Sequence, residues 1–380
     1  MRPYAIIDLH CDTLTDCMHA GSPDSNTLDD PVRSLSLSNL PRDVRWAQFF
    51  AVFVPDELRG EKAIRFFDDA CANFDRQMRK FADLVSPCRN VADMERAWAA
   101  GKTAAFLSVE NGSAFAGDLS RIGKTKRQGV CAVTLTWNGE NELGSGNVTD
   151  RGLTDFGRAA VREMERCGIL IDVSHLNDAG LADVFETAER PFLATHSNAR
   201  AICAHKRNLT DVQIKEMVRR GCLIGLNYYG PFLRDGGAVR SLDDVYRHVA
   251  HFFDLGARKN LALGSDFDGA ALPPTETTKN AFVEGDARTQ ALFRWIRANV
   301  RQPETSRESL ESRLVGKLAE KKAAESDTLR IGREEGTYRT IGLQGKIDLL
   351  VSKTDGMTIY EAKAKGTKAE DLYQLRLYAD

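Results

Sequence analysis

Short apolar runs alternate with longer segments of helical periodicity from Tyr4 to Ser265. The runs are rich in β-branched and aromatic residues and have the length of buried strands. Eight of them can be counted, at Tyr4–Leu9, Trp46–Val54, Ala104–Val109, Val130–Thr136, Ile169–Ser174, Phe192–Thr195, Cys222–Asn227 and Leu261–Ser265. Between them, apolar residues recur every three or four positions, which predicts helices over Lys62–Leu84, Thr154–Cys167, Ala179–Ala188, Thr210–Arg219 and Leu242–Leu255. Eight strand–helix alternations predict an α/β fold, the (β/α)8 TIM barrel.

Metal-competent side chains follow these runs closely. They are found at the ends of the first, third, fifth, sixth and eighth runs, as His10, Asp12, Glu110, His175, His196 and Asp266. Residues two apart on a strand point to the same face, so His10 and Asp12 can hold one ion. In a TIM barrel the carboxyl ends of the strands meet at one mouth. The pattern therefore predicts a metal site at that mouth.

This set of side chains is large enough for a binuclear centre. His10 and Asp12 can hold one ion and the pair His175 and His196 the other, with Glu110 as the bridging ligand. Imidazole with carboxylate suits zinc, and manganese, cobalt and iron remain alternatives. Two ions about 3.5–4 Å apart hold a bridging hydroxide and polarise a carbonyl or phosphoryl oxygen. An additional carboxylate then remains free to move the proton to the leaving group.

Residues 1 to about 272 resemble the membrane (renal) dipeptidases, binuclear zinc barrels of the amidohydrolase superfamily. The resemblance rests on seven motifs in order along the chain, Asp8–Asp12, Ser108–Gly112, Gly152–Gly157, Leu170–His175, Thr195–Ser197, Arg207–Asn208 and Gly264–Gly269. It implies metal-dependent hydrolysis of dipeptides by a metal-bridging hydroxide, often with tolerance of a D-residue at the carboxyl side.

The resemblance also implies roles for individual residues. The metal ligands of the two Zn2+ would be His10, Asp12, Glu110, His175 and His196. Asp266 would be the catalytic acid and base, and Arg207 would clamp the terminal carboxylate of the substrate. A guanidinium suits that task because its planar fork pairs with a carboxylate through two hydrogen bonds.

One position departs from the family pattern. Trp137 stands where the renal enzymes have a histidine that helps to hold the scissile carbonyl oxygen. An indole N–H can still donate one hydrogen bond, but it carries no charge. The departure concerns substrate preference more than activity. Asn138, Asn227 and Tyr228 are further candidates for substrate binding, with a purely structural role as the alternative for each.

Composition predicts a soluble globular protein, and the family resemblance implies a small dipeptide as its substrate. Of 380 residues, 42% are hydrophobic and 28% charged, and the net charge of −2 favours neither a nucleic-acid nor a membrane partner. The eight cysteines form no C-x-x-C pair, and no apolar leader or membrane-length run is present, so we expect reduced thiols in a cytoplasmic protein. A homodimer remains open. His248 and His251 lie three apart in a helical segment, which predicts a solvated face.

The sequence becomes strongly polar and rich in charged residues after Pro274. We expect a dipeptidase-like barrel over 1–274, a linker with a barrel-closing helix over 275–305, and a separate segment over 306–380. That last segment resembles an incomplete PD-(D/E)XK nuclease domain of the RecB-like branch. Asp348 and Glu361 on paired strands could hold Mg2+, with Lys363 on the same face to orient water. Gln374 and Tyr378 are four apart and, on a helix, could face that site.

Several alternatives to the dipeptidase hypothesis remain open. The tail could be a Mg2+-dependent nuclease for which the barrel is an inherited scaffold. The chain could also be an inactive chimera, in which two truncated domains were joined near Pro274 by natural fusion, gene-prediction error or deliberate joining. A different amidohydrolase reaction, on a lactone or a phosphoester, also remains open, because the metals determine the nucleophile and not the substrate.

Overall fold

The structure is a computed structural model that describes residues 4–19, 27–31, 33–40, 44–236 and 242–270, with the strand segments 328–338, 343–353, 356–360 and 377–378. Contacts divide the chain into two compact units, Met1–Phe293 and Arg294–Asp380. Asp348 and Tyr378 lie in described strands of the second unit, whereas Glu361, Lys363 and Gln374 lie outside the described residues.

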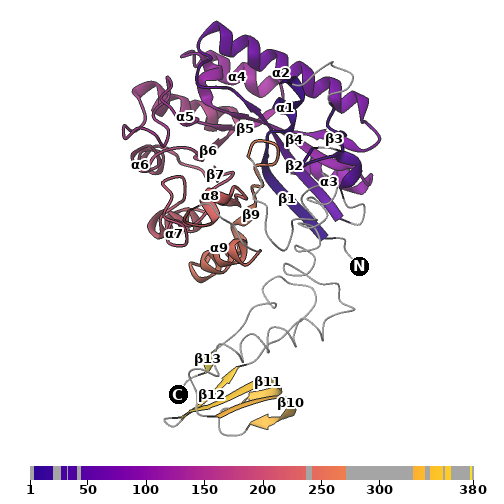
Figure 1. The fold of residues 1–380 in the computed structure, drawn as a ribbon, viewed down its shortest axis with the longest axis vertical. Coiled ribbons are helices and arrows are strands. Elements are labelled where there is room, and N and C mark those ends of the chain that lie inside the picture. The colour runs from indigo at the N-terminus through magenta and orange to yellow at the C-terminus, as the bar shows by residue number, and fades with distance from the viewer. Residues whose placement is uncertain are drawn as a thin grey trace. The chain divides into compact units, whose positions relative to one another are not determined.

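Parallel strands close into a barrel in the first unit (Figure 1). Its members are β1 (Tyr4–Cys11), β2 (Val44–Phe53), β4 (Thr103–Glu110), β5 (Val130–Thr134), β6 (Leu170–Asp172), β7 (Leu193–Ala194), β8 (Leu223–Leu226) and β9 (Leu261–Leu263). The order is β2-β1-β9-β8-β7-β6-β5-β4, and pairing of β2 with β4 closes the ring. All eight strands expected from the apolar runs are therefore present, and the predicted TIM barrel is confirmed.

One further strand, β3 (Val85–Cys88), was not expected from the sequence. It pairs with the first half of β4, through Thr103–Phe106, while β5 pairs with the second half, through Leu107–Glu110. The helix predicted to run to Leu84 ends at Lys80 instead, because the chain turns there to enter β3.

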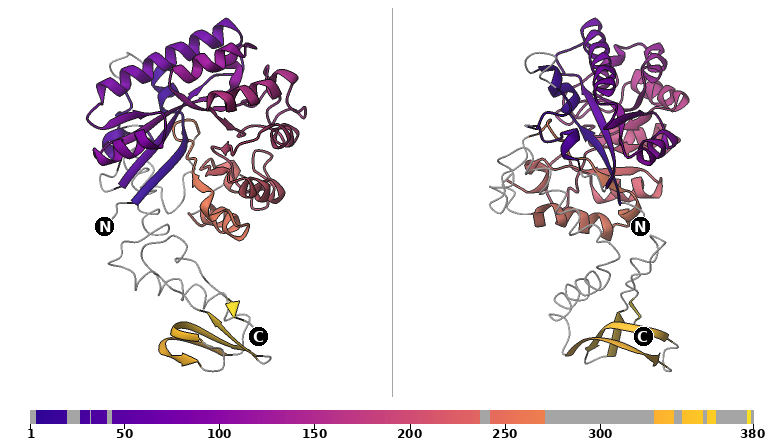
Figure 2. Two further views of the ribbon diagram at one scale, coloured as in Figure 1. Left: turned by 180° about the vertical axis from the view of Figure 1, so that it is seen from behind. Right: turned by 90° about the vertical axis from the view of Figure 1, so that its right-hand side faces the viewer.

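Helices surround the ring of strands (Figures 1 and 2). They are α1 (Thr13–His19), α2 (Glu61–Lys80), α3 (Val91–Ala99), α4 (Ser120–Arg127), α5 (Asp155–Cys167), α6 (Asp178–Thr187), α7 (Asp211–Arg219), α8 (Gly230–Leu233) and α9 (Leu242–Asp254). Local sequence determines where α7 begins, because Thr210 and Gln213 form a reciprocal capping box there. No helix in the described residues has the length and hydropathy of a membrane span.

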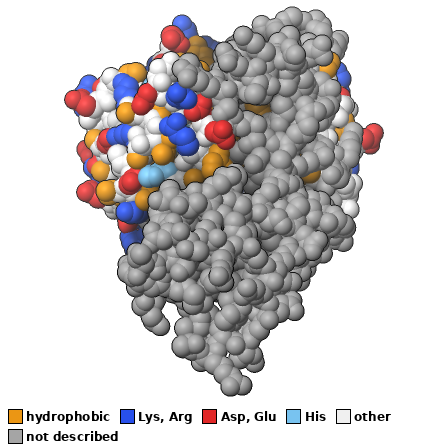
Figure 3. All heavy atoms as spheres, turned by 60° about the horizontal axis from the view of Figure 1, so that its bottom comes forward, with side chains coloured by type: hydrophobic (Ala, Val, Ile, Leu, Met, Phe, Trp, Pro, Cys, Tyr) orange, Lys and Arg blue, Asp and Glu red, His pale blue; other side chains and the backbone are white. Residues whose placement is uncertain are grey.

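Apolar side chains from different parts of the ring fill the barrel. A buried cluster draws on β1, β2, β4, β5 and β7, together with β3 and α3. Within it, the rings of Phe49 and Phe106 stack with centroids 4.8 Å apart. Such filling makes the barrel a packed core with its chemistry at the strand ends. On the face drawn in Figure 3, the described side chains include interspersed acidic and basic groups.

The solvated helix face expected at His248 is wrong. His248 on α9 is fully buried; its Nδ1 accepts a hydrogen bond from the backbone N–H of Ala199, and its Nε2 donates to the carbonyl of Leu233. The face of α9 that carries it packs on the segment after β7 and on α8. His251 is partly exposed and pairs with Asp211.

The described residues of the second unit form a four-stranded antiparallel sheet. Its strands are β10 (Thr328–Tyr338), β11 (Leu343–Lys353), β12 (Gly356–Tyr360) and β13 (Leu377–Tyr378), in that order. Asp348, which was expected on a strand, lies in β11. Tyr378 was expected on a helix, but Leu377 and Tyr378 form a strand that pairs with β12.

Candidate metal centre

The six side chains selected from the sequence lie at the carboxyl ends of five barrel strands. His10 is in β1 and Asp12 follows it, Glu110 ends β4, and the other three follow β6, β7 and β9 as His175, His196 and Asp266. All except Asp266 are less than 10% exposed. Closure of the ring brings them together from positions as far apart in the chain as 10 and 266.

His175 and His196 form the imidazole half of the centre. Their Nε2 atoms are 2.9 Å apart. Glu110 Oε1 lies 2.8 Å from His175 Nε2 and 3.6 Å from His196 Nε2. Ligand atoms of one tetrahedral zinc ion are about 3.3 Å apart, given metal–ligand distances near 2.0–2.1 Å. The three atoms therefore fit ligands of one ion.

His10, Asp12 and Asp266 form the acidic half. His10 Nε2 lies 3.2 Å from Asp12 Oδ2 and 3.8 Å from Asp266 Oδ1. The other oxygen of Glu110, Oε2, lies 3.7 Å from the same nitrogen. Asp12 Oδ1 is buried and has no hydrogen-bond partner among the described residues, which leaves it available to a cation.

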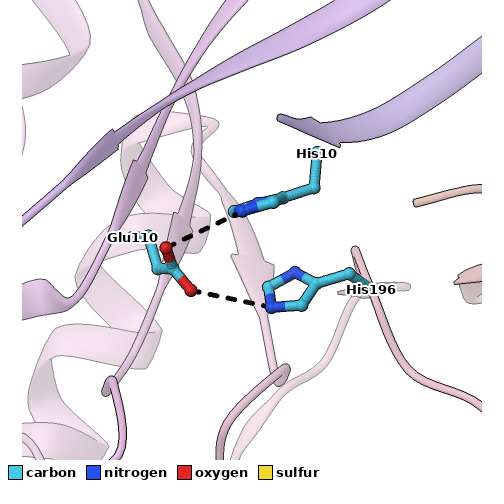
Figure 4. Close-up of side chains that lie close together, drawn as sticks. All are labelled: His10, Glu110 and His196. Atoms are coloured by element: carbon cyan, nitrogen blue, oxygen red, sulfur yellow. Dashed lines mark ion pairs between the residues drawn. The ribbon is translucent and has the colours of Figure 1, made fainter. Parts of the chain in front are cut away.

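Glu110 joins the two halves. Its carboxylate lies between His10 and His196, and its two oxygens pair with different rings, as Figure 4 shows. The ligand atoms of His10, Glu110 and His196 lie within 4.8 Å of one another, as do those of His10, Asp12 and Asp266. The arrangement suits a carboxylate that is shared between two ions.

Hydrogen bonds to Nδ1 leave both Nε2 atoms of the imidazole half free to bind. His175 Nδ1 lies 3.1 Å from Asn138 Oδ1, which also accepts from Asn147 Nδ2 at 2.6 Å. His196 Nδ1 lies 2.8 Å from Thr195 Oγ1. With both Nδ1–H groups donating, the Nε2 lone pairs face each other across 2.9 Å. Two lone pairs at that distance repel, and a cation between them removes the repulsion.

Burial and neighbouring charges together shift the pKa values of the groups in this centre. Burial opposes the charge on His10, but the carboxylates of Asp12 and Glu110 together raise the pKa of His10 to about 10. Burial lowers the pKa of His175 and His196 well below the usual value, and nearby cationic groups lower it further. Burial and the charge of Asp12 raise the pKa of Glu110. A cluster of buried carboxylates with neutral imidazoles is the donor set that a divalent cation stabilises.

Two of the candidate residues adopt left-handed backbone conformations. The φ angle is 70° at His175 and 61° at Asp266. Such conformations cost on the order of 1–3 kcal/mol each and persist where the surroundings hold them, commonly at functional sites. Beside them Gly269 approaches the centre closely, since a Cβ atom there would collide with Asp12 Oδ2 and Asp266 Oδ1.

Arg207 lies in the loop between β7 and α7 and is 5% exposed. Its Nε and Nη2 have no hydrogen-bond partner among the described residues, while its guanidinium packs over the ring of Phe232 at 5.4 Å. Burial lowers the pKa of Arg207 to about 10, although Asp266 and Glu110 raise it, so the group stays charged at neutral pH. A buried guanidinium with unused donors is suited to an anionic ligand.

The four predicted pocket residues lie in different surroundings. Trp137 contacts Phe53 edge-on at 4.8 Å, and its ring centroid is 6.3 Å from that of His175. Asn227 is fully buried and donates from Nδ2 to Asp266 Oδ2 at 3.0 Å. Tyr228 is buried, and its hydroxyl has no partner among the described residues. Asn138 contacts His175, as described above, so two of the four form hydrogen bonds with candidate catalytic or metal-binding groups.

Sequence reasoning missed the residues that support the histidines, Thr195, Asp172 and Asn147. Thr195 and Asp172 belong to the motifs that carry the family resemblance, but nothing in their spacing predicts a contact with an imidazole. Asn147 lies in the loop after β5, in a stretch rich in glycine and asparagine that offers only a loop signal.

The chain matches a known protein family over most of its length. The family model for membrane dipeptidases, peptidase family M19, matches residues 1–281. An uncharacterized protein encoded in the pqqA 5′ region of Klebsiella pneumoniae is 34% identical over 197 residues, which are 49% of this chain and 73% of that protein. An uncharacterized dipeptidase of Schizosaccharomyces pombe is 30% identical over 181 residues, 46% of this chain and 44% of the relative.

Solved structures of metallopeptidases are also similar to this chain. A metallopeptidase from Rhodobacter sphaeroides, liganded with a phosphinate mimic of the dipeptide L-Ala-D-Ala, has a TM-score of 0.71 at 25% identity, covering 79% of this chain and 94% of its own. Dipeptidase AC, an M19 metallopeptidase, has a TM-score of 0.68 at 27% identity, covering 77% and 91%. The family match ends at residue 281, so the nuclease-like hypothesis for the tail gains no support from it. The chain therefore belongs to the membrane dipeptidase family, peptidase family M19, a family of metal-dependent peptide hydrolases.

Proposed function

We propose that this protein hydrolyses dipeptides with two zinc ions at the barrel mouth. His10 and Asp12 would hold one ion and His175 and His196 the other, with Glu110 shared between them. The observation that carries the proposal is the position of Glu110, whose Oε2 lies 3.7 Å from His10 Nε2 and whose Oε1 lies 2.8 Å from His175 Nε2. Imidazole and carboxylate ligands favour zinc among the metals that such a set can bind.

The bound ions would supply a nucleophilic water at neutral pH and polarise the scissile carbonyl. Asp266 would take the proton of that water and pass it to the leaving amine. Burial raises the pKa of Asp266, which suits a group that must both accept and return a proton. The hydrogen bond from Asn227 to Oδ2 orients this carboxyl group and leaves Oδ1 directed towards the centre, 3.8 Å from His10 Nε2.

Arg207 would bind the terminal carboxylate of the substrate. Its two unused nitrogens offer the paired donors that a carboxylate accepts, in a buried position where such a pair is strong. A dipeptide has its carboxylate a fixed distance beyond its only peptide bond, so this contact would exclude longer peptides. Dipeptide specificity would follow from the placement of one cation.

Substrates with a D-residue at the carboxyl side are part of the proposal. Support comes from the Rhodobacter sphaeroides neighbour, whose ligand mimics L-Ala-D-Ala. Trp137, beside His175, would contribute to the wall of the pocket and could donate one N–H to the substrate. We expect this residue to affect the choice of side chain and not the chemical step.

The test combines metal analysis with hydrolysis in one preparation of the full chain. We expect about two zinc ions per chain and cleavage of L-Ala-L-Ala and L-Ala-D-Ala that a chelator stops and added zinc restores. His175→Gln should lower both bound zinc and cleavage. His251→Gln is the matched control, because His251 pairs with Asp211 and contributes to neither half of the centre. A zinc-loaded chain that cleaves neither dipeptide would refute the proposal.

A further inference from the structure

Asp172 is a buried carboxylate that belongs to neither half of the metal centre. It is the last residue of β6 and is 1% exposed. Its Oδ1 accepts from the backbone N–H groups of Ser174, at 3.0 Å, and Thr195, at 2.8 Å. Its Oδ2 accepts from the hydroxyls of Thr134, at 2.5 Å, and Thr195, at 2.6 Å. Four donors converge on one carboxylate between strands β5, β6 and β7.

The direction of these hydrogen bonds determines where the proton of His196 lies. Each oxygen of Asp172 accepts two hydrogen bonds, and the single hydroxyl proton of Thr195 points to Oδ2. Thr195 Oγ1 can then only accept from His196 Nδ1, which lies 2.8 Å away. The ring must therefore carry its proton on Nδ1. Its Nε2 lone pair is left directed at Glu110 and at the Nε2 of His175.

We propose that Asp172 is a positioning residue that fixes the tautomer and orientation of His196 through the hydroxyl of Thr195. The inference rests on the proposed role of His196 as a metal ligand. Ligating histidines commonly donate their second N–H to a carboxylate or carbonyl, which raises their basicity and holds the ring. Here the carboxylate of Asp172 does not contact the ring of His196 directly but acts through the hydroxyl of Thr195, which lies between them.

The neighbouring ligand differs in how it is held. His175 donates to the side-chain amide of Asn138, a neutral acceptor that Asn147 orients. The carboxylate behind Thr195 makes its hydroxyl a better acceptor than an isolated hydroxyl, because hydrogen bonds in a chain polarise one another. We therefore expect His196 to be the more firmly held of the two rings.

Three variants of the full chain test the proposal. Thr195→Val removes the hydroxyl with little change of shape, and Thr195→Ser restores it. Thr134→Val is the matched control, because Thr134 donates to the same Oδ2 of Asp172 but forms no hydrogen bond with an imidazole among the described residues. In the metal-free protein with labelled histidine, long-range nitrogen–proton NMR reports the tautomer of His196. In the same samples, competition with a chelator gives the zinc dissociation constant.

We expect the Nδ1–H tautomer of His196 in the wild type and in Thr195→Ser, and its loss in Thr195→Val. Zinc binding should weaken about 10- to 100-fold in Thr195→Val, as for other residues that orient metal ligands. An unchanged tautomer in Thr195→Val would overturn the inference. So would a Thr134→Val variant that weakens zinc binding as much as Thr195→Val does.

Measuring the tautomer of His196 tests the role of Thr195 independently of whether the protein binds zinc. If the wild-type protein bound no zinc, the metal assignment would fail, but the NMR spectrum of His196 would still decide the role of Thr195.

The Asp172→Asn variant is a second test of the proposal. Its amide group would meet four donors, so we expect mixed tautomers and weaker zinc binding than in Thr195→Val, in protein shown to be folded by circular dichroism.

Discussion

On one side of the Glu110 carboxylate, His10 is surrounded by carboxylates, whereas on the other side His175 and His196 face each other. In the acidic half, the neighbours Asp12 and Glu110 raise the pKa of His10 to about 10. In the imidazole half, burial lowers the pKa of both rings. One half therefore holds its histidine by charge, and the other by hydrogen bonds to Nδ1.

This difference has a consequence for metal binding. An ion in the acidic half must displace a proton from His10, whereas the rings of the imidazole half are already neutral. Zinc should therefore enter the imidazole half first at neutral pH, because ligand deprotonation opposes binding. The two halves depend on different support, and substitutions can separate them.

Substitution of the residue that joins the halves should have the largest effect. Glu110→Gln keeps the size of the side chain and removes the charge that both ions would share. We expect bound zinc to fall below one ion per chain and dipeptide cleavage to fall about 1,000-fold or more, as loss of several kcal/mol of charge stabilisation requires. Metal analysis and a rate assay measure both. Glu216→Gln, on the surface of α7, is the control, and two bound zinc ions in Glu110→Gln would refute the bridging role.

Asp266→Asn should separate chemistry from metal binding in the acidic half. The amide cannot carry a proton between water and the leaving amine, so we expect kcat to fall about 100- to 10,000-fold. Zinc content should stay near the wild-type value, because His10, Asp12 and Glu110 remain. Steady-state kinetics with L-Ala-D-Ala and metal analysis of the same sample make the test. Wild-type kcat in this variant would remove Asp266 from the proton transfer.

Arg207→Lys should show whether the buried cation serves the substrate or balances the charge of the two halves. Lysine keeps the charge but loses the planar fork, so we expect KM for dipeptides to rise about 10-fold or more with a smaller change in kcat. The increase should disappear for dipeptide amides, which lack the terminal carboxylate. A loss of zinc without a change in KM would instead assign Arg207 to the metal centre.

His248 provides a buried histidine outside both halves, and its effect should be confined to stability. Burial lowers its pKa to about 4, so the unfolded chain binds a proton more readily between pH 6.5 and 4. The stability this neutral ring contributes is present above pH 6.5 and is lost, by about 3 kcal/mol, as pH falls to 4. Urea unfolding from pH 7 to 4 should be less pH-dependent in His248→Gln, with zinc content unchanged. Equal slopes for both proteins would contradict the assignment.

Much of the fold could be predicted because strand and helix periods are local properties of the chain. The eight apolar runs and the caps of helices such as Thr210–Arg219 are visible without tertiary contacts. Strand β3 was missed because four residues containing Pro87 give no alternation. Tyr378 was assigned to a helix because its spacing from Gln374 fits a helix, whereas cross-strand pairing with β12 places it in a sheet.

The sequence by itself determined which chemistry-bearing residues end each strand, because parallel strands in a closed ring deliver their carboxyl ends to one mouth. Only the tertiary structure decided how those residues are supported. Asn138 and His175 are 37 residues apart in the chain, Thr134 and Asp172 are 38 apart, and the contact of Ser265 with His10 spans 255. Hydrogen bonds act over about 3 Å between groups that closure of the barrel brings together, so no local pattern encodes them.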